Sequence, residues 1–330
     1  MSRESTGRLS LSSSPAPGQI TVSGEIVADL IADMHSPGDF RFHVGGQGAN
    51  VALALARLGM SSTLLMPMSR DALGERFAAI LSEAGVRLPL ASASDLPTSI
   101  ALVSLREGQP VYSLYREGVA DRDLHRDRIL SALPVDPAVH VIGAFCYAVE
   151  PDRHFWLEIA QASRQRGALL SSDPNIRRGV MENAGEQPRP MLQALRQADI
   201  VKASDEDLAW LFPGLDPHQA ALRLFDDSRV ELVALTLGEQ GSVLRTRSRE
   251  VRVPARPARP FADAVGAGDT YHAALLSGLL RLGATTTAHL AALDRADLTT
   301  LASTASVAAS LACEHSGCQP PTADEVAAAG

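Results

Sequence analysis

Cysteine and clustered positive charge are both scarce in this sequence of 330 residues. The three cysteines, Cys146, Cys313 and Cys318, are too few and too scattered for a disulfide framework, and none has a paired histidine at a metal-ligand spacing. The formal net charge of -8 leaves no basic surface for nucleic acid or anionic lipid. We therefore expect a reduced, cytoplasmic setting, with no nucleic-acid partner and no membrane partner.

The sequence also lacks a signal peptide and both common nucleotide-binding fingerprints. Its first 17 residues are polar and Ser-rich, without an apolar stretch of signal-peptide length, and we interpret residues 1–18 as a disordered tail. Neither G-x-G-x-x-G nor G-x-x-x-x-G-K-[ST] occurs. These absences argue against a nicotinamide-dependent oxidoreductase of the Rossmann type and against a P-loop NTPase.

From Gln19 onward, short β-branched runs alternate with longer stretches rich in Ala and Leu. This rhythm is typical of parallel strands separated by covering helices, so we expect an α/β fold with a mostly parallel central sheet. Residues 50–59 predict a buried helix that ends at Gly59. The expected strands are residues 20–27, 140–145, 168–173, 199–204 and 232–238.

One stretch departs from this rhythm. Residues 98–118 read as two alternating strands around a turn at 107–110, which predicts a β-hairpin rather than a crossover unit. Residues 41–44 form another short alternating piece. We expect these pieces to make a small sheet outside the main layer, a β lid contributed by about residues 32–44 and 97–120 of a domain spanning 19–330.

The segment DAVGAGD, residues 263–269, carries the strongest chemical signal. Three small residues, Gly266, Ala267 and Gly268, precede Asp269 and a helical run, so backbone amides at a helix start are open to an anion. Asp269 could then take the proton of an attacking hydroxyl while the amides stabilise a transferring phosphoryl group. The alternative is an ordinary Gly-rich loop in which Asp269 caps the helix.

Two further Gly-containing segments add polar groups to such a site. In GGQGAN, residues 45–50, Asn50 at a helix start can donate and accept hydrogen bonds with sugar hydroxyls, and Asp29, just after the first strand, can accept two. TLGEQGSV, residues 236–243, follows a strand and is placed to bend over phosphate or ribose. Taken singly, GGQGAN could equally be a tight turn, Asp29 a solvated turn residue and TLGEQGSV a hairpin turn.

In this order and spacing the motifs resemble the phosphofructokinase-B, or ribokinase-like, family of carbohydrate kinases, over about residues 19–320. GGQGANVALALARLG (45–59) and DAVGAGDTYHAAL (263–275) are similar to the two family signatures. The resemblance implies a three-layer α/β/α core with a small β lid. It also implies transfer of the γ-phosphoryl group of ATP to a primary hydroxyl of a small sugar.

The resemblance assigns roles to individual residues. Asp269 would be the catalytic base beside an anion hole, and a second set would hold the sugar. The anion-hole residues are Gly266, Ala267 and Gly268, and the sugar-binding residues are Asp29, Gly45, Gly46 and Asn50. The expected nucleotide-binding residues are Lys202, Ser204, Thr236, Gly238, Gly241, Gly266, Gly268 and Ser306, the last standing where many relatives have Asn.

The family organises magnesium through an N-x-x-E element, which here falls on Ser204 to Asp207. Asp207 or Glu206 would contact Mg²⁺ through water, since magnesium keeps several waters and borrows substrate phosphates. The alternative is a solvated helix start. Asp263 and the turn ending at Gly317 fall where relatives often bind a monovalent cation such as K⁺.

Two segments, YREGVAD (115–121) and DPNIR (173–177), are similar to motifs of fructokinases. By this resemblance Arg116 and Asn175 would lie near the sugar, and Arg177 would lie near the transferring phosphate. The alternatives are an exposed strand residue for Arg116 and a surface salt bridge for Arg177. Because GGQGAN has a ribokinase-like Gly where many fructokinases carry Pro or Ala, ribose, a nucleoside and 2-keto-3-deoxygluconate stay open as acceptors.

An alternative of another class is a non-catalytic sugar or nucleotide sensor on the same fold. Lids of relatives often pair to make dimers, so we expect a homodimer. The histidines show no metal or triad spacing and are assigned no role. Trp156 and Trp210 are expected to pack helices against the sheet.

Overall fold

The computed structural model describes residues 18–32, 39–106, 109–143, 145–177 and 187–330, and only the backbone of residues 103–106 and 109–112. The expected tail, apart from Gly18, lies outside these residues, as does the centre of the expected turn at 107–110. Within the described part of the chain, no helix is both long and apolar enough to cross a bilayer.

An eight-stranded sheet forms the centre of the molecule, in the order β12-β11-β10-β9-β8-β7-β1-β4. Its strands are β1 (Gln19–Ser23), β4 (Ser61–Leu64), β7 (Pro137–Gly143), β8 (Leu169–Asp173), β9 (Ile200–Ser204), β10 (Leu232–Thr236), β11 (Ser242–Thr246) and β12 (Glu250–Val253). In this sheet the neighbouring strands from β4 to β10 pair in parallel, whereas β11 pairs antiparallel with both β10 and β12. The expected α/β fold is confirmed.

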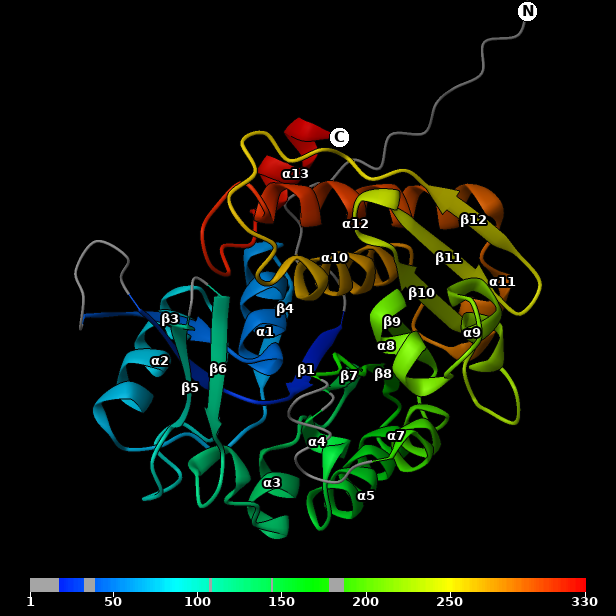
Figure 1. Cartoon of the computed structure of the whole chain (residues 1–330). Helices are drawn as coiled ribbons and strands as arrows, with labels where there is room; N and C mark the ends of the chain where they lie inside the picture. The colour runs from blue at the N-terminus through cyan, green and yellow to red at the C-terminus, as the bar shows by residue number, and fades with distance from the viewer. Residues whose placement is uncertain (1–17, 33–38, 107–108, 144, 178–186) are drawn as a thin grey trace, which may run out of the picture.

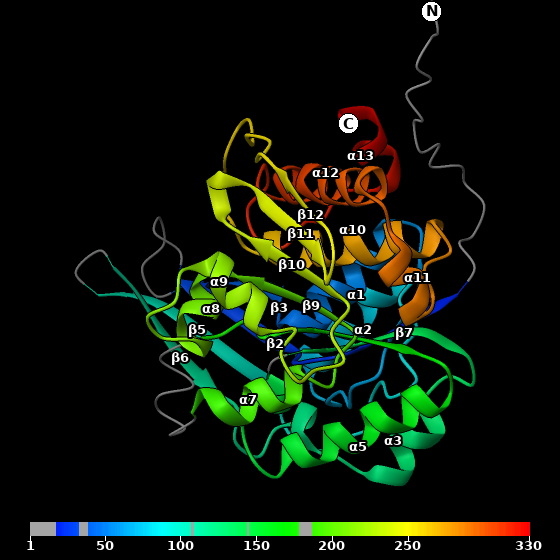
Figure 2. The same ribbon diagram turned by 90° about the vertical axis from the view of Figure 1, so that its right-hand side faces the viewer.

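Helices cover both faces of this sheet. Figures 1 and 2 show α10 and α12 above it and α3, α5 and α7 below it. The α-helices are α1 (Gln47–Arg57), α2 (Ala72–Glu83), α3 (Arg126–Ala132), α4 (Phe145–Ala148), α5 (Asp152–Gln165), α7 (Pro188–Leu195), α8 (Asp205–Leu211), α9 (Pro217–Arg223), α10 (Ala267–Arg281), α11 (Thr287–Ala292), α12 (Arg295–Ala312) and α13 (Ala323–Ala329). Two short 3₁₀ helices are η1 (Ala120–Arg122) and η2 (Gly238–Gln240).

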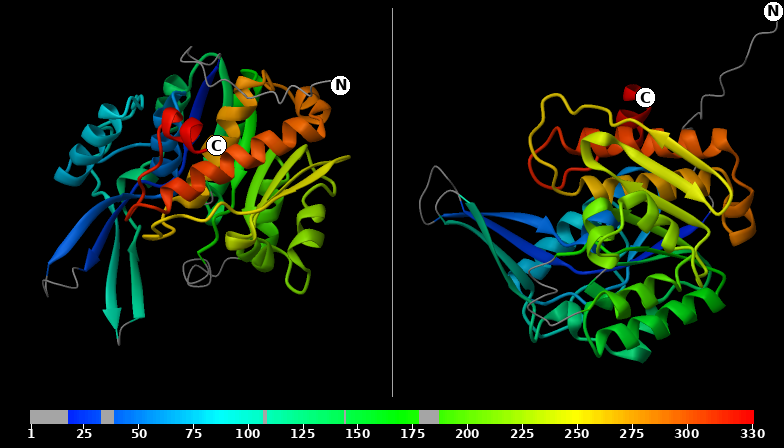
Figure 3. Two further views of the ribbon diagram at one scale, coloured as in Figure 1. Left: turned by 90° about the horizontal axis from the view of Figure 1, so that it is seen from above. Right: turned by 45° about the vertical axis from the view of Figure 1, so that its right-hand side comes forward.

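A second, four-stranded sheet has the order β3-β2-β5-β6. Its strands are β2 (Val27–Ala32), β3 (Phe40–Gly45), β5 (Ser99–Arg106) and β6 (Gln109–Tyr115). Figure 3 shows the pairs β2–β3 and β5–β6 extending away from the helices. On its inner side Phe42 of β3 packs edge-on against Phe77 of α2, with ring centroids 5.5 Å apart.

The first expected strand, residues 20–27, proves to be two strands in two different sheets. The chain leaves β1 at Ser23, bends through residues 24–26 and enters β2 at Val27. Gly24 permits the bend because the backbone of Gly48 lies so close that an added Cβ would come within 2.8 Å of its Cα. The small sheet therefore begins earlier than the expected lid, and Asp29 lies within β2 rather than in a loop.

One part of the hydrophobic core lies where α1 and α10 pack together on the large sheet. All but two residues of α1 are buried, and α1 packs against β1, β4 and α10. Gly59 follows the helix with a φ of 79°, the left-handed conformation expected of a helix stop. Trp156 and Trp210 are buried in the core, as expected.

Candidate active site

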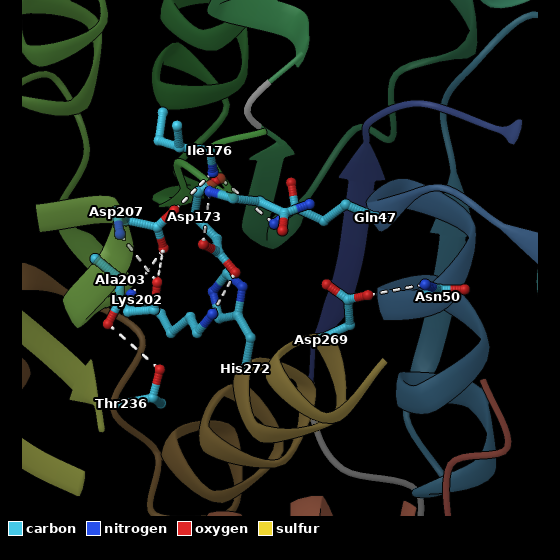
Figure 4. Close-up of polar contacts among 12 residues, drawn as sticks. Gln47, Asn50, Asp173, Ile176, Lys202, Ala203, Asp207, Thr236, Asp269 and His272 are labelled. Carbon is cyan, nitrogen blue, oxygen red and sulfur yellow. Dashed lines mark hydrogen bonds and ion pairs between the residues drawn. The ribbon is translucent and has the colours of Figure 1, made fainter. Parts of the chain in front are cut away.

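Polar side chains from β8, β9, β10, α1 and α10 converge beside the carboxyl ends of the parallel strands (Figure 4). Asp173, Ser204 and Thr236 are the last residues of β8, β9 and β10, and the first turns of α1 and α10 face them. Carboxyl ends of parallel strands are where open α/β sheets bind ligands. This edge therefore holds the candidate active site.

Asp269 is the third residue of α10, whose N-cap Gly266 adopts a left-handed conformation with φ 73°. An added Cβ at Gly266 would come within 2.5 Å of Cys318 Sγ, and one at Gly268 within 2.9 Å of Lys202 Nζ. A side chain at Gly266 would meet Cys318 in a left-handed backbone conformation, whereas one at Gly268 would displace the end of the Lys202 side chain. The amide of Ala267 donates to the carbonyl of Ala264 at 3.2 Å, so the amides of Gly266 and Gly268 are the better candidates for an anion hole.

The Asp269 carboxylate is buried and paired with one neutral donor. Asn50 Nδ2 donates to Asp269 Oδ2 at 2.8 Å, while Asn50 Oδ1 is buried without a partner among the described residues. Burial raises the pKa of Asp269 to about 7, against the lowering effects of the Asn50 bond, Lys202 and Arg177. Such a carboxylate is suited to accept a proton near neutral pH.

Asp29 faces the same region from the small sheet. It pairs in register with His43 of β3, and its carboxylate lies against the backbone of Gly45, where any Cβ would collide with it. Burial raises the pKa of Asp29 to about 6, Arg177 lowers it and Glu25 raises it further. The expected sugar residues Asp29 and Gly45 thus lie together.

Lys202, the only lysine of the chain, is buried under the anion-hole loop. Its Nζ forms an ion pair with Asp173 Oδ2 at 2.9 Å, and Asp173 Oδ1 accepts a hydrogen bond from the amide of Asn175 at 3.1 Å. Despite burial the pKa of Lys202 is raised, because Asp173, Asp207 and Asp269 surround it. A fixed positive charge therefore lies beside the expected phosphate position.

The two expected magnesium residues are placed very differently. Asp207 is buried and accepts hydrogen bonds from the amides of Ile176 and Ser204, at 2.6 and 2.7 Å, and from the Ser204 hydroxyl at 2.7 Å. It forms a capping box with Ser204 at the start of α8. Glu206 is exposed on the same turn and leaves its carboxylate to solvent. Of the two carboxylates, Glu206 is therefore the more accessible.

The expected nucleotide segment is a hairpin between β10 and β11. Gly238 and Gly241 have φ angles of 54° and 92°, and a Cβ at Gly241 would collide with the carbonyl of Val253. Thr236 Oγ1 lies 3.5 Å from the carbonyl of Ala203, and Ser306 of α12 lies 3.5 Å from the carbonyl of Pro254. Both hydroxyls make only these long contacts among the described residues.

Asp263 ties the anion-hole loop to the C-terminal turn. Its Oδ1 accepts a hydrogen bond from the amide of Val265 at 2.9 Å, and its Oδ2 accepts one from the amide of Gly317 at 2.8 Å. A Cβ at Gly317 would come within 2.8 Å of His43 Nδ1, so the small sheet touches this turn. No group of three or more His, Cys, Asp or Glu suited to a metal occurs among the described residues.

Of the expected fructokinase-like residues, Arg116 is not an exposed strand residue. It follows β6 and pairs with Asp121 Oδ2 at 2.7 Å, with only 13% of its side chain exposed. Asn175 has a φ of 39°, which is unusual for a residue other than glycine. Arg177 is exposed, yet its charge lowers the pKa of both Asp29 and Asp269.

Several residues of this region are not identified by the sequence motifs. Asp173 is only part of the DPNIR motif, although its position at the end of a predicted strand is a usable signal. Glu25 and Cys318 gave no signal, because each comes into place only through a bend or a loop from a distant segment.

Comparison with known proteins agrees with this geometry. The pfkB family carbohydrate kinases match residues 18–325 of the chain. Fructokinase-1 of Zea mays is 32% identical over 265 residues, which is 79% of each chain, and the fructokinase of Rhizobium leguminosarum bv. trifolii is 31% identical over 83% of this chain and 84% of its own. A fructokinase from Vibrio cholerae O395, solved with fructose, ADP and calcium ion, shares 25% identity, covering 94% of this chain and 98% of its own, at a TM-score of 0.79.

The chain therefore belongs to the pfkB family of carbohydrate kinases. Its activity is accordingly that of a sugar kinase, as the motifs predicted.

Proposed function

We propose that this sugar kinase transfers the γ-phosphoryl group of ATP to a primary hydroxyl of fructose. The observation that carries the proposal is the buried Asp269 carboxylate, held by Asn50 at a glycine-flanked helix start and facing a region that contains Asp29. The fructokinases among the relatives support the choice of sugar, since the Vibrio enzyme was solved with fructose and ADP.

In the proposed mechanism Asp29 and Asn50 orient the sugar so that one primary hydroxyl faces Asp269. Asp269 takes the hydroxyl proton as the oxygen attacks the γ-phosphorus in line, and the bond to the β-phosphate oxygen of ATP breaks. The amides of Gly266 and Gly268, with Lys202 behind them, stabilise the charge on the transferring group. Arg177 lies at the exposed side of the site, where its planar fork could hold a phosphate oxygen.

We also propose Mg²⁺ as the metal, with Glu206 contacting it through water. When bound, magnesium would neutralise the phosphate charge, and most of its ligands would come from ATP itself. The capped Asp207 carboxylate suits a structural role at the start of α8 instead. Asp263 and the Gly317 turn are our proposed place for K⁺.

The structure weakens the sequence argument for an acceptor other than fructose, which was based on the glycine at position 48. The ribokinase-like Gly48 packs against the backbone of Gly24, where a Cβ would come within 2.7 Å of the Gly24 Cα. Packing at the bend between the two sheets therefore accounts for this glycine, whichever sugar is bound.

The activity is tested by an ADP-release assay with fructose, ribose, nucleosides and 2-keto-3-deoxygluconate, with and without Mg²⁺ and K⁺. ADP release that is fastest with fructose supports the proposal. Sugar and ATP binding without ADP release would support the sensor alternative, and faster release with another acceptor would replace fructose.

We further propose a cytoplasmic homodimer formed through the small sheet. Phe40 at the start of β3 and Tyr115 at the end of β6 are 46% and 59% exposed, and both belong to edge strands that could pair with a second copy. Light scattering of the purified protein measures the oligomeric state, and a monomer at all concentrations contradicts this proposal.

A further inference from the structure

A buried charged cluster lies where the small sheet joins the body of the molecule. We call Glu25, Ser99, Arg116 and Asp121 the lid-root cluster. Glu25 lies two residues before β2, Ser99 begins β5, and Arg116 directly follows β6. Asp121 of η1 accepts hydrogen bonds from Ser99 Oγ at 2.6 Å and from Arg116 Nη2 at 2.7 Å. The cluster therefore fixes the roots of β5 and β6 to each other.

Glu25 connects the remaining strand, β3, and the helix that follows it. Its Oε1 accepts a hydrogen bond from the amide of Gln47 at 2.9 Å, the first residue of α1, and Gly46 lies against its backbone carbonyl. β3 ends at Gly45, the residue before Gly46. All four strands of the small sheet therefore end at the lid-root cluster or at a residue next to it. The same helix turn carries Asn50, the partner of Asp269.

Two buried atoms of opposite charge in this cluster have no partner among the described residues: Glu25 Oε2 and Arg116 Nε. Only 3% of Glu25 is exposed, and the Arg116 guanidinium lies over the ring of Phe145 at 4.9 Å, which shields it from water. The two side chains are close enough for each charge to shift the pKa of the other. An unsatisfied donor and acceptor at such a site are costly to leave unpaired.

We propose that Glu25 and Arg116 are positioning residues of the sugar site, and that Glu25 Oε2 accepts a hydrogen bond from Arg116 Nε when the small sheet closes over the sugar. This inference rests on the proposed function. Closing the pair would tie the root of β2 to the root of β6 across the intervening β5, which holds Asp29 of β2 over the sugar, while the Gln47 bond holds Asn50 at the base. Sugar binding thereby favours the closed state, in which Glu25 Oε2 and Arg116 Nε are hydrogen-bonded to each other.

A double-mutant cycle tests the pairing. Glu25→Gln keeps an oxygen for the Gln47 amide but removes the charge, and Arg116→Lys keeps a cation for Asp121 but has no Nε–H. We expect each variant to raise the fructose KM and Kd about 10-fold, with an unchanged ATP KM, and the double variant to lose little more than either single one. Additive losses, or equal changes in the ATP KM, would overturn the pairing.

A matched control is Glu231→Gln, which removes a carboxylate from the ion pair with Arg247 at 3.0 Å and lies outside the site. Glu231→Gln should leave the KM values for fructose and for ATP unchanged. Thermal unfolding shows whether each variant is folded. Fructose binding is also measured by calorimetry, which requires no turnover. A wild-type chain that neither binds nor phosphorylates any sugar of the panel overturns the proposed function and this inference together, whereas additivity in an active enzyme overturns the inference alone.

Discussion

Asn50 of α1 donates a hydrogen bond of 2.8 Å to the carboxylate of Asp269 in α10, although 219 positions separate them in the sequence. The contact joins the two glycine-rich segments into one site, in which we propose that the first faces the sugar and the second faces phosphate. Burial raises the pKa of this carboxylate to about 7, and the bond from the neutral Asn50 amide only partly offsets that rise.

Replacing Asp269 with Asn should lower kcat by at least about 10²-fold, because the amide cannot accept the hydroxyl proton. The fructose Kd should change little, since the amide keeps the shape of the side chain. Steady-state rates and calorimetric binding measure the two effects. Near-normal turnover would rule out Asp269 as the base.

The pH dependence of kcat/KM should report the titration of Asp269 in the free enzyme. The base must be ionised, so the rate should rise with pH, with a midpoint near 7, and then level off. Asn50→Ala removes the bond that lowers this pKa and should move the midpoint to higher pH. Asp29, with a pKa of about 6, should add a second rise in kcat/KM at lower pH, and Asn50→Ala should leave that rise in place. A midpoint that moves to lower pH contradicts the assignment.

Asp269 should also make the free protein less stable as pH rises. Its folded pKa of about 7 lies above the ordinary value of 3.8, so between these values the unfolded chain ionises while the folded one stays protonated. Asp269→Asn removes this penalty, which is at most about 4 kcal/mol for a shift of about 3 units. The Tm difference between variant and wild type should therefore grow from pH 4 to pH 7 and then stay constant. A difference independent of pH would show that the carboxylate is not protonated in the folded protein.

Because Gly266 lies against Cys318, we expect a side chain at position 266 to lower turnover. Gly266→Ala should lower kcat by at least about 10-fold, because the methyl group meets the thiol and the left-handed φ disfavours alanine. Cys318→Ala alone should keep normal turnover. In the double variant part of the loss should return, since the steric clash is gone while the backbone strain remains. Full activity of Gly266→Ala would show that this loop tolerates a side chain.

The central layer and the catalytic segment could be predicted from sequence because both depend on local signals. Alternating apolar runs located β7 to β10 within a few residues, and the glycines before Asp269 marked the start of α10. The bend at Glu25 could not be predicted, since β-branched residues continue through it and only the packing of Gly24 on Gly48 separates the two sheets. The hydrogen bond from the Ile176 amide to Asp207 likewise joins residues 31 positions apart, which a local capping motif does not reveal.

The burial of α1 beneath α10 has a consequence for synthesis on the ribosome. The helix emerges early, but the surface that covers it is encoded more than 200 residues later, together with the catalytic base. A nascent chain therefore holds an apolar helix face open until nearly all of the protein has been made. Chains that terminate before α10 should be both inactive and prone to aggregate, so phosphorylating activity marks only completed molecules.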